Sequence, residues 1–224
     1  MPNELWTDID RYITDLLMPP DPALDAALQA TVDADLPQIN VAPNQGKLLH
    51  LLAQIQGARS VLEIGTLGGY STIWLARALP PDGRLITLEA DPRHAEIARA
   101  NIARAGLSEV VEVRVGRAAD TLPQLADEGL GPFDLFFIDA DKQSIADYFQ
   151  WALRLSRRGS LIIVDNVIRR GDVLDASSED PGVAGTRRFY DVLAAEPRVS
   201  ATALQTVGSK GHDGFALALV TADQ

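Results

Sequence analysis

Hydrophobic residues follow two different patterns in this chain. Over the first 58 residues they recur at helical spacing, and after that they form short continuous runs separated by amphipathic segments. Trp6, Ile9, Ile13 and Leu16 are spaced about three and four residues apart, which predicts a helix near the start. Two further helices are predicted over 23–33 and 44–55. The first quarter of the chain is therefore expected to form a helical cap.

From residue 59 onward, apolar runs alternate with helical patterns. Strands are predicted over 60–64, 84–88, 110–115, 133–138 and 161–164, and helices over 71–78, 91–105, 119–125 and 148–155. Continuous apolar runs indicate strands buried on both faces, and their alternation with helices is typical of a parallel sheet covered on both sides.

The last quarter has a different order of elements. A helix predicted over 186–194 is followed by strands over 199–207 and 215–220, with no helix between them. Two such strands are expected to pair antiparallel at one edge of the sheet. The sequence thus predicts a doubly wound, seven-stranded, mostly parallel α/β sheet. We expect one domain over 1–224, divided into a cap over 1–58 and a core over 59–224.

Two of the predicted core strands end on a carboxylate. Asp139 directly follows the run Phe133–Ile138, and Asp165 and Asn166 directly follow the run Leu161–Val164. Ligands bind at the carboxyl ends of strands in such sheets, so these three side chains are expected to meet. Carboxylate and amide oxygens suit Mg²⁺, Mn²⁺ or Ca²⁺. The alternative is that Asp165 and Asn166 only form a turn.

A glycine-rich turn follows the first predicted strand. Gly65, Gly68 and Gly69 lie just before a predicted helix, and Glu89 ends the second strand. Glycines let a ligand approach the backbone at a helix N-terminus, and an acid about 20 residues later can bind ribose hydroxyls. The spacing differs from G-x-G-x-x-G, which argues against a dinucleotide site and leaves a tight turn as the alternative.

Composition narrows the function classes. The chain has 224 residues, 46% of them hydrophobic, no cysteine and a formal net charge of −11. Disulfides, thiolate metal sites and a cysteine nucleophile are excluded. The acidic balance argues against a broad nucleic-acid surface. No secretory signal and no apolar run of membrane-spanning length are found, so a cytoplasmic location without membrane contact is expected.

Four motifs, taken together, resemble the cation-dependent O-methyltransferases, which include catechol and caffeoyl-CoA O-methyltransferases and their bacterial relatives. The motifs are V-L-E-I-G-T-L-G-G-Y-S, L-E-A-D at 88–91, F-I-D-A-D-K at 137–142 and I-V-D-N at 163–166. The resemblance covers roughly residues 38–220, in order and without large gaps. The resemblance implies a Rossmann-like core that binds S-adenosylmethionine, and a homodimeric assembly.

The resemblance also implies roles for individual residues. Around the methionine half of S-adenosylmethionine it places Glu63, Gly65, Gly69 and Ser71, with the backbone near Val41 beside Ser71 at the carboxylate. Glu89 would bind the ribose, and Gly116 and Ala118 would pass the adenine. Asp139 would serve cofactor and metal together, with Asp165 and Asn166 completing the Mg²⁺ site.

Lys142 would be the general base, since a lysine stands three residues after this aspartate in the family pattern. A divalent cation nearby would favour loss of its proton. Asp141 is expected to cap the following helix.

The predicted reaction is methyl transfer to a small phenolic molecule with vicinal hydroxyls. Arg169 or Arg170 could face an acidic group of the acceptor or be simply solvated, and the loop 172–180 could close over it. Three alternatives remain open: methylation of 5-hydroxyuridine at the tRNA wobble position, a nicotinamide-dependent dehydrogenase, and a cofactor-binding module without catalysis.

Overall fold

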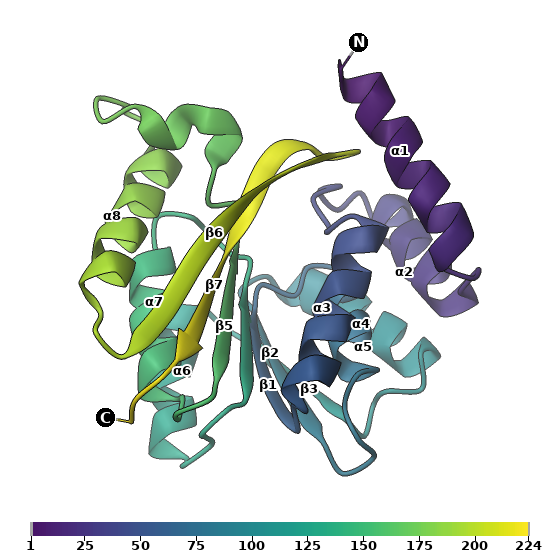
Figure 1. The fold of residues 1–224 in the computed structure, drawn as a ribbon. Helices are drawn as coiled ribbons and strands as arrows, with labels where there is room; N and C mark the ends of the chain where they lie inside the picture. Colours follow the sequence, from purple (N-terminus) through teal and green to yellow (C-terminus); the bar gives the residue numbers. More distant parts are fainter. Residues whose placement is uncertain (1, 224) are drawn as a thin grey trace.

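A seven-stranded sheet forms the centre of the computed structural model, which describes residues 2–223 (Figure 1). The strands are β1 (Ser60–Ile64), β2 (Arg84–Glu89), β3 (Val111–Val115), β4 (Leu135–Ile138), β5 (Leu161–Asp165), β6 (Val199–Gly208) and β7 (Gly211–Val220). Their order is β3-β2-β1-β4-β5-β7-β6. The first five are parallel, while β7 pairs antiparallel with both β5 and β6. The predicted sheet and its antiparallel edge hairpin are confirmed.

Helices cover both faces of this sheet (Figure 1). They are α1 (Pro2–Leu17), α2 (Pro22–Asp33), α3 (Pro43–Gln56), α4 (Tyr70–Ala76), α5 (Pro92–Arg104), α6 (Ala118–Asp127), α7 (Ile145–Arg154) and α8 (Pro181–Ala195), with a short 3₁₀ segment, η1 (Arg169–Leu174). The predicted N-terminal cap corresponds to α1, α2 and α3.

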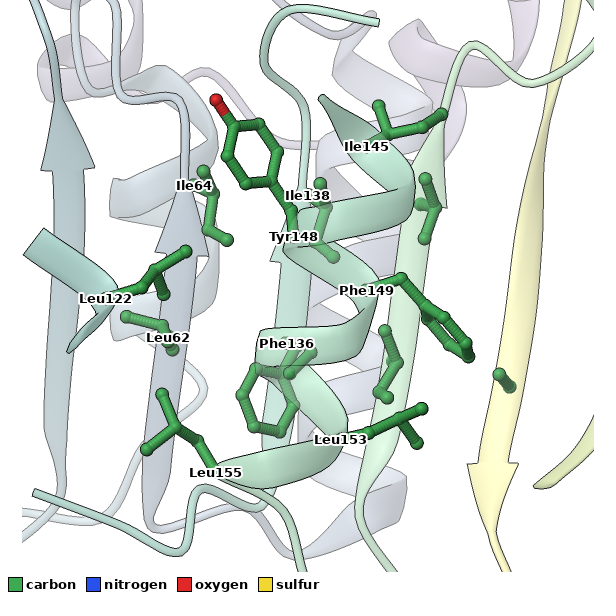
Figure 2. Close-up of a cluster of buried hydrophobic side chains, with 14 of the residues drawn as sticks. Leu62, Ile64, Leu122, Phe136, Ile138, Ile145, Tyr148, Phe149, Leu153 and Leu155 are labelled. Carbon is green, nitrogen blue, oxygen red and sulfur yellow. The ribbon is translucent and has the colours of Figure 1, made fainter. Parts of the chain in front are cut away.

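Alternate residues of each central strand enter two separate hydrophobic clusters. On β4, Phe136 and Ile138 pack with α6, α7 and α8, whereas Leu135 and Phe137 pack with the cluster on the α3, α4 and α5 side. Figure 2 shows the first cluster, in which Phe149 of α7 lies over the sheet. A strand buried on both faces cannot alternate with polar residues, which explains the continuous apolar runs.

Several boundaries differ from the expectation. Helix α8 begins at Pro181, five residues before the predicted start at 186, and Asp180 caps it through the backbone N–H groups of Gly182 and Val183. Strand β7 begins at Gly211 rather than at 215, so the hairpin closes tightly through Ser209 and Lys210.

The loop 172–180, expected to be flexible, starts inside η1. Its closure over an acceptor stays a prediction.

Among the helices of residues 2–223, none combines the length and the apolar character needed to cross a lipid bilayer.

Candidate active site

The two acid-ended strands lie side by side, as predicted. Strands β4 and β5 are paired with Ile138 opposite Val164, so Asp139 and Asp165 follow at the same edge of the sheet. Lys142 joins them: its Nζ donates to Asp139 Oδ1 at 2.9 Å and to the Asp165 carbonyl oxygen at 3.1 Å. The structure therefore gathers the predicted base and two predicted metal ligands at one point.

Asp165 carries the strongest electrostatic perturbation in this group. Burial, together with the neighbouring charge of Asp139, raises the pKa of Asp165 to about 7. Its Oδ2 accepts a hydrogen bond from Gln45 Nε2 at 2.7 Å, and its Oδ1 accepts one from the backbone N–H of Asn166 at 2.8 Å. Asn166 has φ +56°, a left-handed conformation that asparagine tolerates better than most residues.

The donor chemistry fits a divalent cation such as Mg²⁺. Asp139, Asp165 and Asn166 offer only hard oxygen ligands, and the mutual repulsion of the two acids is what a cation would offset. Within residues 2–223, no cluster of three His, Cys, Asp or Glu side chains is found. In such a site, the amide oxygen of Asn166 would supply the third protein ligand.

A cavity of about 780 Å³, which we call the acceptor cavity, opens beside Asp165 and Asn166. Its walls are the 38–48 segment, η1 and the tip of the β6–β7 hairpin. Asp10 of α1 ties the walls together, accepting from Asn44 Nδ2 at 2.8 Å and from the backbone N–H of Ser209 at 2.7 Å. The N-terminal cap and the hairpin thus enclose a space large enough for a small aromatic molecule.

The glycine turn approaches the same point from β1. Gly65 has φ +100°, and a Cβ there would lie 2.1 Å from the Asp139 carbonyl oxygen, so only glycine fits. Glu89 braces this turn, because its Oε2 accepts from the backbone N–H groups of Thr66 and Leu67 at 3.2 and 2.7 Å. Gly69, with φ +80°, is the N-cap of α4.

The remaining predicted cofactor residues come from four different segments. Gly116 and Ala118 follow β3, where the Gly116 N–H donates to the Glu89 carbonyl at 2.8 Å. Val41 is buried and lines the acceptor cavity. The Ser71 hydroxyl donates to Glu63 Oε1 at 2.6 Å.

Glu63 is fully enclosed by protein. Besides Ser71, the hydroxyls of Thr72 and Thr87 donate to its Oε2. Burial, with a smaller contribution from the charge of Asp139, raises the pKa of Glu63 to about 7 despite these three donors. Glu63 therefore holds Ser71 at the start of α4 rather than forming an open part of the wall.

Lys142 is positioned by a close backbone contact that the sequence did not reveal. A Cβ at Gly185 of α8 would lie 2.1 Å from the Lys142 carbonyl oxygen and 2.7 Å from the Gln143 Cα. Asp141, expected to cap α7, instead accepts a hydrogen bond from the Tyr148 hydroxyl at 2.6 Å, and the N-cap position belongs to Ser144.

Gln45 and Asp213 are further residues that sequence reasoning missed. Asp213 Oδ1 accepts hydrogen bonds from the backbone N–H groups of Ile168 and Arg169 at 3.0 and 3.1 Å. Asp213 thereby fixes the segment that follows Asp165 and Asn166. Neither Gln45 nor Asp213 belongs to a motif, so no local signal identified either.

Residues 20–220 match the family model described as O-methyltransferase. The chain belongs to the O-methyltransferase family. Its curated relatives include proteins named "Catechol O-methyltransferase" from Niastella koreensis (58% identical, covering 98% of this chain and 100% of the relative) and from Mycobacterium tuberculosis (57% identical, covering 95% of each).

Solved O-methyltransferases share the whole fold. The Bacillus cereus enzyme, in complex with SAH, is 60% identical with a TM-score of 0.97 and covers 98% of this chain and 100% of its own. TomG from Streptomyces achromogenes, in complex with SAM, is 54% identical with a TM-score of 0.96 and covers 99% and 100%. This O-methyltransferase is accordingly an S-adenosylmethionine-dependent enzyme.

Substituting Gly185 tests the backbone contact behind the base. In Gly185→Ala we expect kcat to fall about 10- to 100-fold, because the added Cβ must push the Lys142 segment away. Alanine is the better helix former, so helix propensity cannot cause a loss. Methyl-transfer kinetics measure the effect, with the exposed neighbour Ala184→Ser as control. Unchanged kcat in Gly185→Ala would show that the contact is dispensable.

Glu63 predicts a specific dependence of stability on pH. Its folded-state pKa is raised from 4.5 to about 7, so its contribution is full below pH 4.5 and is lost as pH rises through about 7. The rise in pKa from 4.5 to about 7 corresponds to roughly 3 kcal/mol in the free energy of unfolding. Glu63→Gln should flatten the free energy of unfolding between these pH values, measured by urea denaturation. The control Glu96→Gln, at an exposed position of α5, should keep the wild-type dependence of this free energy on pH. If Glu63→Gln kept the same dependence, the raised pKa of Glu63 would be refuted.

Proposed function

We propose that this enzyme methylates one of two vicinal hydroxyls on a small phenolic molecule, with a divalent cation held by Asp139, Asp165 and Asn166. The observation that carries the proposal is the contact of Lys142 with Asp139 and with Asp165, the second of which lines the acceptor cavity. Relatives more than half identical in sequence and named catechol O-methyltransferase support the same acceptor class.

The chain's own residues can carry out the proton and positioning steps. A bound cation would neutralise the two carboxylates and favour the ionised form of an acceptor hydroxyl. Lys142 Nζ, when neutral, takes the hydroxyl proton, and its contacts at 2.9 and 3.1 Å fix where it can do so. The turn at Gly65 and Gly69 would hold the methyl donor, with Glu89 at the ribose and Ser71 at the carboxylate. Most of the rate is expected from alignment of the methyl group with the acceptor oxygen.

The acceptor cavity also bears on the choice between a small molecule and tRNA. Asp10 closes it between α1 and the hairpin tip, and Lys210 Nζ adds a contact to the Gln38 carbonyl at 3.1 Å. A cavity bounded by these contacts suits a compact acceptor better than a nucleotide attached to a folded RNA.

Removing a proposed ligand tests the cation. Asp165→Ala should abolish methyl transfer to catechol, whereas the wild type should need added Mg²⁺ and stop with a chelator. Asp127→Asn, an exposed acid at the end of α6, is the control and should retain activity. Full activity of Asp165→Ala in chelator would disprove the metal assignment. Transfer by the wild type to tRNA but to no phenol would disprove the acceptor class.

We further propose a homodimer formed through the outer face of α1. Leu5, Ile9, Tyr12 and Leu16 are 60%, 47%, 67% and 64% exposed. Their spacing of four, three and four residues places them in one stripe along the helix, while Asp10 faces the hairpin. An exposed apolar stripe of this kind is typical of an interface, and a second copy would bury it against its own equivalent.

Charged substitutions in the stripe test this assembly. Light scattering after size exclusion should give twice the chain mass for the wild type. The double variant with Tyr12→Lys and Leu16→Lys should be monomeric, since burying unpaired charges is costly. Arg11→Gln lies on another face of α1 and should stay dimeric. A monomeric wild type, or a dimeric double variant, would contradict the proposal.

A further inference from the structure

Arg169 is a cation of the acceptor cavity that lacks a partner. It lines the cavity three residues after Asn166, and it is only partly exposed. Its Nε is buried without a hydrogen bond, and within residues 2–223 no ion pair of its guanidinium is found. A partly buried charge without a partner is costly, so a ligand that supplies the partner would bind favourably here.

The acids around the cavity are already used by the protein. Asp10 accepts from Asn44 and Ser209, and Asp180 accepts from two backbone N–H groups of α8. Asp213 accepts from three backbone N–H groups. Among the described side chains that line this cavity, Arg169 is the one with a buried donor that lacks an acceptor.

The backbone holds this arginine in a strained conformation. Arg169 and Arg170 have φ +54° and +58°, where residues other than glycine are disfavoured. The Asp213 carboxylate stabilises the strained segment through the N–H groups of Ile168 and Arg169. Strain held in this way is typical of a position where the side chain must point in a required direction.

We propose that Arg169 binds a carboxylate on the acceptor, whose vicinal hydroxyls lie at Asp165 and Asn166. The inference rests on the proposed function and narrows it to aromatic acids with a catechol ring. A guanidinium can bind both oxygens of a carboxylate at once. Such a contact would attract the acceptor and also orient its aromatic ring. The cavity volume of about 780 Å³ accommodates such a molecule.

Matched acceptors separate the charge from the ring. We compare 3,4-dihydroxybenzoate with its neutral methyl ester in the Mg²⁺-loaded enzyme. In Arg169→Gln, KM for the acid should rise about tenfold or more while KM for the ester stays within about twofold. Arg169→Lys keeps the charge and should retain part of the preference. Arg158→Gln, an exposed arginine at the opposite end of β5, should behave like the wild type.

A binding measurement keeps this inference separate from the reaction. Calorimetric titration with Mg²⁺ and S-adenosylhomocysteine present should show that the wild type binds the acid more tightly than the ester, and that Arg169→Gln loses the difference. If the acid preference were absent in the wild type, or unchanged in Arg169→Gln, the proposal would be overturned. Equal weakening for acid and ester, with Arg169→Lys no better, would instead show a structural role and also overturn it. If binding followed the expectation but no phenol were methylated, the carboxylate subsite would stand and the proposed reaction would fail.

Discussion

The catalytic end of this fold depends on one ion pair, between the ammonium of Lys142 and the carboxylate of Asp139. Parallel pairing of β4 with β5 forces Asp139 and Asp165 to the same edge, where the half-buried Asp139 and the buried Asp165 repel each other. Burial and this repulsion together raise the pKa of Asp165, and the charge of Lys142, which contacts Asp139 and the Asp165 carbonyl, offsets part of the rise. The same charges that make the site costly to fold are those that the proposed cation would offset.

Backbone contacts, more than side-chain packing, set the geometry of this pair. Gly65 brings the cofactor turn against the Asp139 carbonyl, and Gly185 brings α8 against the Lys142 carbonyl. Each approach leaves no room for a Cβ, so the backbone at Asp139 and at Lys142 is held by a close contact with another element. Close-packed interiors transmit displacements, so a shift at either glycine would reach the neighbouring side chain.

The sequence predicted the sheet and the core of the site for the same physical reason. Buried strands leave continuous apolar runs, and a polar residue at the end of such a run stands out, as Asp139 and Asp165 do. Gln45 lies 120 residues from Asp165, which it contacts, and Gly185 lies within an ordinary helical pattern. Neither tertiary contact produces a pattern in the neighbouring sequence, so neither could be predicted. The early start of α8, by contrast, could have been predicted from the sequence. Asp180 followed by Pro181 is a typical helix start, although the apolar pattern alone did not show it.

The two acids assigned to the cofactor act in different ways. Glu89 accepts hydrogen bonds from the N–H groups of Thr66, Leu67 and Asp91, yet a carboxylate has about four lone-pair directions, so it can still accept from a further donor such as a ribose hydroxyl. Glu63 has no exposed surface and already receives three hydroxyl donors, so it can influence a ligand only through Ser71. Its partner Ser71 lies at the helix end where the donor's carboxylate would bind. The Ser71 hydroxyl is therefore held by an acid that is itself enclosed by protein.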